Sequence, residues 1–115
     1  MNDFTNLSKR IIKFRNDRDW AQFNNPKDRA ISLILEVSEL LEHFQWKNSE
    51  EITEYLKNNK KDVSDELSDI LYWVLLIAND LDIDLEKSLS RKMSENEKKY
   101  PISKSKGKHA KYTEL

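Results

Sequence analysis

The sequence of 115 residues has no cysteine, one glycine and only two prolines. Without cysteine there are no disulfides, thiolate metal sites or thiol nucleophiles, which favours a reducing compartment such as the cytoplasm. The shortage of glycine and proline favours long helices, because strands need turn residues every several positions. We therefore expect an all-α, cytoplasmic protein.

Two further absences concern partners. The sequence has no run of about 18 apolar residues that would span a bilayer, and its first residues lack the basic and apolar blocks of a signal peptide. Its 20 basic and 21 acidic side chains give a formal charge of -1. No net field therefore draws it to nucleic acid or to an anionic membrane, and we expect neither as a partner.

The balance of apolar and charged residues bears on size and assembly. Only 37% of the residues are hydrophobic and 36% are charged, so a monomer would be marginal unless some apolar surface lay against another chain. We expect a homodimer or homotetramer. One domain is predicted over residues 1–101, because Pro101 blocks the last helix, followed by a lysine-rich tail at 102–115 that is mobile unless it docks.

Apolar residues recur at three- and four-residue spacing, which predicts four main helices. They cover residues 4–17, 26–46, 62–81 and 85–100, with a short helical turn at 49–56 and a polar loop at 58–61. Asn25, Ser49 and Asp84 are the expected N-caps, and Pro26 suits a first helical turn.

Two of these helices carry carboxylates inside apolar segments. At about 100° per residue, Glu36 and Glu39 share one stripe of the second helix, and Glu66 and Asp69 share one stripe of the third. If the helices pack antiparallel through their apolar faces, the two pairs confront each other across a groove. Four carboxylates at close range repel one another, so we expect a cation to neutralise them.

The apolar residues of the two helices fall into two groups, one expected to pack within the chain and one expected to contact a second subunit. The faces expected to pack within the chain are Leu33, Ile34, Val37, Leu40, Leu41 and Phe44 in the second helix and Val63, Leu67, Ile70, Leu71 and Val74 in the third. Ile31, Leu35, Leu75 and Leu76 fall outside these faces, and we expect them to contact another subunit.

A site with only oxygen ligands indicates a hard metal ion, with Mg²⁺ the first choice and Mn²⁺ the second. Mg²⁺ commonly completes its shell with phosphates, which indicates phosphate ester or anhydride chemistry. His43 shares the acidic stripe, and we interpret it as a partner for a carboxylate. In a highly charged chain, such acidic pairs are also often solvated helix faces.

Three other readings compete with a metal-dependent enzyme. A non-enzymatic helical interaction module uses the same apolar faces but gives no reason for acids inside them. A ferritin-like oxidoreductase expects Glu-x-x-His pairs, whereas both pairs here end in an acid. A nucleic-acid binder is disfavoured by the balanced charge, because the lysine-rich tail is short.

Several short motifs extend over nearly the whole chain in a fixed order. They are Arg18-Asp19-Trp20 with Gln22-Phe23, Glu36-Val37-Ser38-Glu39-Leu40, Phe44-Gln45-Trp46, Asp65-Glu66-Leu67-Ser68-Asp69, Lys92-Met93 with Asn96, Tyr100-Pro101, and Lys111-Tyr112-Thr113. This ordered set resembles the MazG-like all-α nucleotide pyrophosphohydrolases, and most closely their dCTP pyrophosphatase type.

The resemblance implies a bundle of four main helices that forms a dimer or a dimer of dimers. It implies that Glu36, Glu39, Glu66 and Asp69 hold the metal and carry the catalysis. The implied reaction cleaves a nucleoside triphosphate, dCTP or a similar nucleotide, to the monophosphate and pyrophosphate. Its implied role is to remove unwanted nucleotides and so protect the nucleotide pool. One departure is Ile11, where some relatives have histidine near the base, which puts the base preference in doubt.

Substrate-binding residues follow from the chemistry of a nucleotide. Lys92 and Asn96 lie one turn apart on the fourth helix and are the phosphate-side candidates, with Lys99 and Lys111 weaker ones. Aromatic rings stack on bases, so the base-side candidates are Trp20, Trp46 and Trp73. For each tryptophan, packing in the core or at a subunit interface is the competing role.

Overall fold

The computed structural model describes residues 3–23 and 25–114, and within these ranges it contains helices and no strand. The elements are α1 (Asp3–Asp17), η1 (Trp20–Phe23), α2 (Pro26–Glu42), α3 (Ser49–Asp80), α4 (Leu85–Lys99), α5 (Ile102–Ser105) and η2 (Tyr112–Glu114). The predicted all-α fold is confirmed.

The chain divides into two compact units, one up to Asp82 and one from Ile83 onward. The predicted domain boundary after residue 101 stays a prediction. Within the described ranges, no helix is both long enough and apolar enough to cross a membrane.

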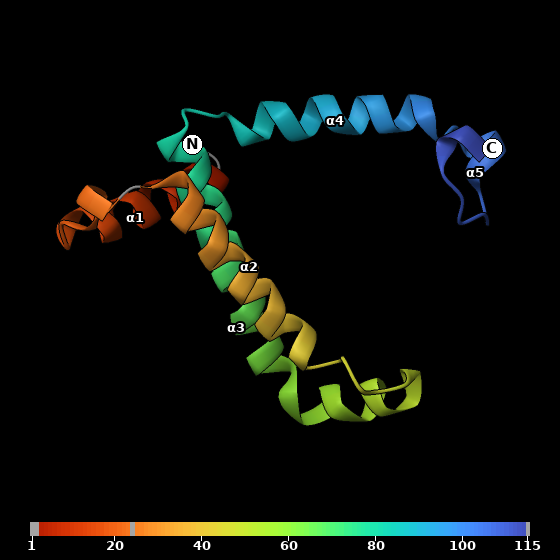
Figure 1. Ribbon diagram of the computed structural model, residues 1–115. Helices are drawn as coiled ribbons and strands as arrows, with labels where there is room; N and C mark the ends of the chain where they lie inside the picture. Colours follow the sequence, from red (N-terminus) through yellow and green to blue (C-terminus); the bar gives the residue numbers. More distant parts are fainter. Residues whose placement is uncertain (1–2, 24, 115) are drawn as a thin grey trace. The chain divides into compact units, whose positions relative to one another are not determined.

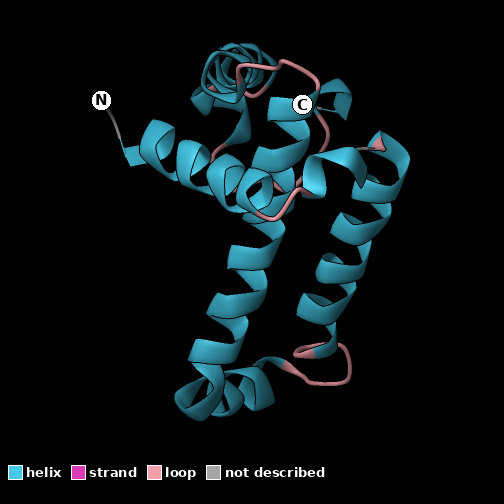
Figure 2. Cartoon of the chain, turned by 90° about the vertical axis from the view of Figure 1, so that its left-hand side faces the viewer, coloured by secondary structure: helices cyan, strands magenta, loops and turns pink. Residues whose placement is uncertain are grey.

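In the first unit, α2 and α3 run antiparallel and pack on each other, and α1 packs on α3 (Figure 1). Figure 2 shows the same helices from the side, joined by short loops. The most buried apolar side chains are Leu75, Leu76 and Ala78, all on the second half of α3. The expectation that Leu75 and Leu76 contact another subunit is therefore wrong, because α1 and α2 both cover this part of α3.

The faces predicted to pack within the chain are only partly buried. Leu33, Leu40, Val63, Ile70 and Val74 are half-buried. Others are largely exposed, including Ile34 at 63%, Leu41 at 54% and Leu67 at 53%. The prediction placed neighbours on more than one side of α2, whereas within the chain α2 packs chiefly on α3, so the apolar side chains on its other sides stay exposed. Ile31 and Leu35 are exposed, and their contact with another subunit stays a prediction.

The predicted loop at residues 58–61 is wrong, because α3 continues through it. Asn59 donates its side-chain amide to the carbonyl of Tyr55 at 2.8 Å, and Lys61 forms an ion pair with Asp65 one turn later at 3.0 Å. Both interactions join residues four apart and so support a helix. Figure 1 shows α3 changing direction between its yellow-green first part and its green second part.

The helix ends follow the predicted capping signals with two corrections. The side chain of Asn25 accepts hydrogen bonds from the amides of Lys27 and Asp28, and Asp84 accepts one from the amide of Lys87. The cap of α3 is Asn48, in a capping box with Glu51, where Ser49 was predicted. The second helix ends at Glu42, four residues before the predicted end, and residues 43–46 form turns.

The second unit contains α4, α5 and η2. Arg91 and Glu95 form an ion pair along α4 at 2.7 Å, and their contact lowers the pKa of Glu95. The region predicted as a tail contains the short helices α5 and η2, and its last residue, Leu115, lies outside the described residues.

Candidate active site

Three of the four predicted carboxylates lie together between α2 and α3. One carboxylate oxygen each of Glu36, Glu39 and Glu66 lies within 4.8 Å of the others. Glu36 and Glu66 are half-buried, whereas Glu39 is exposed. The Oε2 atoms of Glu36 and Glu66 are buried, and neither has a hydrogen-bond partner among the described residues. We call these three residues the glutamate cluster.

Repulsion within the cluster is visible in its acid–base properties. Burial raises the pKa of Glu36 above its ordinary 4.5, and the contact with Glu39 and the charges of Asp69 and Glu66 raise this pKa further. The pKa of Glu66 is also raised, first by burial and then by Glu39 and Asp69, while His43 acts in the opposite direction. A bound cation would relieve this repulsion.

The fourth predicted ligand, Asp69, is exposed and is not one of the three residues of the cluster. Its charge still reaches Glu36 and Glu66. Asp69 also lines a hollow of about 350 Å³ between α1 and α3. The other lining residues are Leu7, Arg10, Ile11, Phe14, Ser68 and Tyr72. Asp69 therefore lies where the hollow approaches the cluster.

The three tryptophans occupy different environments. Trp20 is 44% exposed and lies edge-on to Phe14, with the ring centroids 5.8 Å apart. Trp73 is half-buried and lies edge-on to Tyr72 at 5.1 Å. Trp46 follows α2 and is 86% exposed. Trp20 and Trp73 thus contact the aromatic residues of the hollow, whereas the ring of Trp46 is exposed.

Phe14 and Tyr72 of the hollow were not among the predicted base-side residues. Their rings contact each other edge-on, with the centroids 6.3 Å apart. The sequence offered a signal for Tyr72, which directly precedes Trp73 and follows Asp69 by three residues, so that it lies near the acidic stripe of α3. For Phe14, the apolar spacing of the first helix was the signal available, and this spacing does not distinguish a base-side residue from a packing residue.

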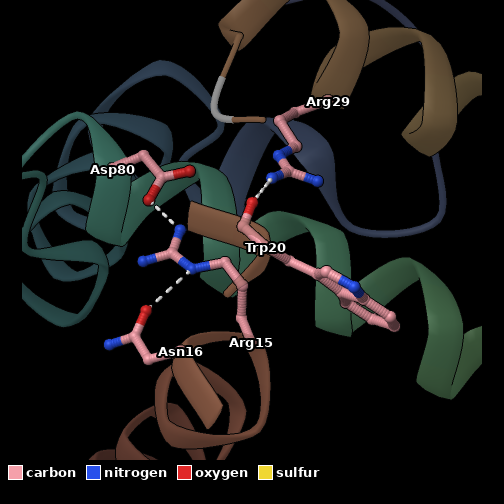
Figure 3. A network of polar contacts seen from close by, with 5 residues as sticks. All are labelled: Arg15, Asn16, Trp20, Arg29 and Asp80. Carbon is pink, nitrogen blue, oxygen red and sulfur yellow. Dashed lines mark hydrogen bonds and ion pairs between the residues drawn. The ribbon is translucent and has the colours of Figure 1, made fainter. Parts of the chain in front are cut away.

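A buried ion pair that the sequence did not reveal joins α1 to the end of α3. Arg15 is 5% exposed, and its guanidinium contacts the carboxylate of Asp80 and donates to the side chain of Asn16 at 3.3 Å (Figure 3). In the same view, Arg29 of α2 donates to the backbone carbonyl of Trp20 at 3.3 Å. These contacts fix α1, η1 and α2 around α3.

The predicted phosphate-side residues belong to the second unit. Lys92 and Asn96 lie on α4, where Lys92 is exposed, 3.7 Å from Glu95, and Asn96 is half-buried. Their role in binding phosphate stays a prediction, as does that of Lys99 and Lys111.

Comparison with known proteins places the chain in a family. The model of the MazG-like family matches residues 31–115. The chain is 37% identical to dCTP pyrophosphatase 1 of Bos taurus and 34% identical to that of Homo sapiens, each over 90% of this chain and 62% of the relative. It thus spans less than two thirds of these relatives. The crystal structure of a pyrophosphatase from Archaeoglobus fulgidus is similar with a TM-score of 0.82 and 36% identity, over 88% of this chain and 94% of that one. The chain belongs to the MazG-like family.

Proposed function

We propose that the chain is a nucleotide pyrophosphohydrolase that cleaves a nucleoside triphosphate to the monophosphate and pyrophosphate. The names of its relatives, dCTP pyrophosphatase and pyrophosphatase, support this reaction class. They also make dCTP or a similar deoxynucleotide the first candidate substrate, and removal of such nucleotides from the pool the biological role. The cysteine-free composition agrees with action in the cytoplasm.

The glutamate cluster is the single observation that carries this proposal. The atoms that it offers to a metal are all carboxylate oxygens. Two oxygens of the cluster, Oε2 of Glu36 and Oε2 of Glu66, are buried without a hydrogen-bond partner in the described part of the chain. Such atoms fit a hard divalent cation, Mg²⁺ first and Mn²⁺ second. Glu36, Glu39 and Glu66 would hold this cation, with Asp69 joining from the side of the hollow.

The side chains around the cluster have distinct tasks in the proposed reaction. A bound divalent cation supplies positive charge to the phosphate oxygens and makes a water more acidic. Glu39 is the exposed member of the cluster and contacts both other glutamates, so, where it does not bind the cation directly, it is placed to accept the proton of the attacking water. No covalent protein nucleophile is needed.

The nucleobase and the phosphates need further contacts. We assign the base to the hollow of about 350 Å³, because its volume suits a small planar group and Phe14 and Tyr72 line it. Trp20, Trp46 and Trp73 are further aromatic candidates. Lys92 and Asn96 on α4 are the candidates for the phosphate side.

Exposed apolar side chains support a homodimer or homotetramer. Ile34 is 63% exposed, Leu35 58% and Trp46 86%, and all three belong to α2 or the turn after it. A second copy of the chain would remove these side chains from water. We therefore propose that the enzyme works as a homo-oligomer.

The reaction is tested with the purified chain, Mg²⁺ and a panel of common and modified nucleoside triphosphates. We expect equal amounts of monophosphate and pyrophosphate, fastest with dCTP or a related deoxynucleotide, and no product when a chelator removes the metal. Release of inorganic phosphate as the first product would contradict the proposed cleavage site. A chain that neither turns over any nucleotide nor is stabilised by Mg²⁺ would be a helical interaction module.

The raised pKa values of Glu36 and Glu66 predict how Mg²⁺ stabilises the protein at different pH. A carboxyl whose pKa is higher in the folded state favours folding below its ordinary 4.5 and loses this contribution as pH rises through its folded pKa. Because Mg²⁺ binds the ionised form, the increase in Tm on adding Mg²⁺ should grow as pH rises above 4.5. Thermal unfolding from pH 4.5 to 8, with and without Mg²⁺, measures this.

The same titration of Glu36→Gln provides the control, because this variant should show a smaller fall of the metal-free Tm with pH and a smaller response to Mg²⁺. The lowered pKa of Glu95 acts below 4.5 and leaves this range unaffected. A Mg²⁺ response that is equally large at pH 4.5 and pH 8 would contradict the assignment.

A further inference from the structure

His43 is held between two side chains of α3. It directly follows the last residue of α2. Its Nδ1 is in hydrogen-bond contact with the hydroxyl of Tyr55, and its Nε2 lies 3.9 Å from Oε1 of Glu66. The side chains of His43 and Glu66 are 15% and 21% exposed, so water screens this contact only in part. Both ring nitrogens are therefore directed at polar groups.

The orientation of the ring determines which nitrogen carries hydrogen. A tyrosine hydroxyl that donates to Nδ1 leaves the hydrogen of a neutral imidazole on Nε2. This N–H faces Oε1 of Glu66. The other oxygen, Oε2, is buried and has no hydrogen-bond partner within the described ranges. His43 thus attracts one oxygen of the carboxylate and leaves the second for another ligand.

Tyr55 is itself fixed by its neighbours. The ammonium of Lys47 lies 4.3 Å from the centre of the Tyr55 ring, and the His43 ring lies 5.7 Å away on a tilted plane. The backbone carbonyl of Tyr55 accepts a hydrogen bond from Asn59. The hydroxyl is therefore presented to His43 by a ring with little freedom to turn.

We propose that His43, held by the hydroxyl of Tyr55, is a positioning residue that orients Glu66 for binding a divalent cation. Partners of this kind behind a ligand commonly change metal affinity on the order of 10- to 100-fold. The inference rests on the proposed function, because it takes Glu66 as a metal ligand. It adds two residues, Tyr55 and His43, to which neither the sequence motifs nor the relatives' names assign a role in binding metal.

Three variants of the full chain test the proposal, with free Mn²⁺ as the probe and no nucleotide present. Tyr55→Phe removes only the hydroxyl and keeps the ring beside Lys47. His43→Phe removes both nitrogens. His43→Gln keeps an N–H near the position of Nε2. Electron paramagnetic resonance of free Mn²⁺ gives the dissociation constant of each variant.

We expect the dissociation constant for Mn²⁺ to rise on the order of 10-fold in Tyr55→Phe and at least as much in His43→Phe. His43→Gln should recover part of the affinity. The metal-free Tm of Tyr55→Phe should stay close to that of the wild type, which a merely structural role for the hydroxyl would not allow. If His43→Phe does not fold, Tyr55→Phe alone decides the question.

Glu66→Gln separates this proposal from the proposed function. If Glu66→Gln loses Mn²⁺ affinity while Tyr55→Phe binds Mn²⁺ like the wild type, the role of His43 and Tyr55 is overturned and the metal site stands. If Glu66→Gln also binds Mn²⁺ like the wild type, the metal site itself is wrong. Lys57→Met is a matched control, because Lys57 lies on the same helix, is 62% exposed and pairs with Glu54, so its loss should leave Mn²⁺ affinity unchanged.

Discussion

Replacing Glu66 with glutamine is expected to lower kcat/KM at least about 100-fold while leaving the metal-free protein as stable as before or more stable. The loss of activity follows because the neutral amide is a poor ligand for a hard cation. The gain in stability follows because the variant removes one of the charges that raise the pKa of Glu36. Few substitutions of a half-buried charged residue combine these two effects.

Steady-state kinetics with Mg²⁺ and the preferred triphosphate measure the first effect, and thermal unfolding in a chelator measures the second. Glu54→Gln is the matched control. Glu54 lies on the same helix, its side chain is 72% exposed and it forms an ion pair with Lys57 at 2.8 Å, so its loss should change neither quantity noticeably. Full turnover by Glu66→Gln would refute the metal site, and a strongly lowered Tm would show that Glu66 is structural.

Helical periodicity was sufficient to predict most helical residues. It did not predict which faces of the helices are covered by neighbouring helices. The ends of α1 and α4 agree with the structure to within about one residue, and the caps Asn25 and Asp84 agree with it, because local spacing and capping chemistry determine them. The loop at 58–61 was predicted from polarity alone, yet Asn and Lys are tolerated in an exposed helix when a partner lies one turn away. The polarity of residues 58–61 therefore indicated that they are exposed, but it did not justify predicting a loop.

The candidate site was predictable where it depends on the spacing within one helix. The carboxylates of Glu36 and Glu39 share a stripe, and Glu66 of α3 lies beside them. Contacts between residues that are far apart in sequence were not predictable: Tyr55 reaches His43 only because α3 turns back beside the end of α2, and Phe14 lines the hollow only because α1 packs on α3. Such contacts depend on tertiary packing, which a helical wheel does not contain.

Removing the charge of Arg15 is expected to have the largest effect on stability. Arg15→Met leaves the carboxylate of Asp80, whose side chain is 10% exposed, without its counter-charge. Breaking a buried ion pair in this way costs about 3–5 kcal/mol, a large part of the roughly 5–15 kcal/mol that stabilises a small domain. Urea unfolding followed by circular dichroism measures the change, and Lys13→Met on the same helix is the control. The Lys13–Asp17 pair is 75% and 51% exposed, so its loss should cost at most about 1 kcal/mol.

A double variant separates the need for this pair from the need for balanced charge. Oδ2 of Asp80 is buried without a hydrogen-bond partner in the described part of the chain, so the pair is not fully satisfied. Arg15→Met with Asp80→Leu should therefore recover most of the stability that the single variant loses, because apolar side chains replace both charges. If the double variant is as unstable as Arg15→Met, the ion pair contributes by itself.

In the pair of Arg15 and Asp80 the two charges balance, and removing one of them should destabilise the fold. In the glutamate cluster they do not balance, and removing one should stabilise the metal-free fold, so the sign of the effect distinguishes a structural charge from one kept for a bound cation.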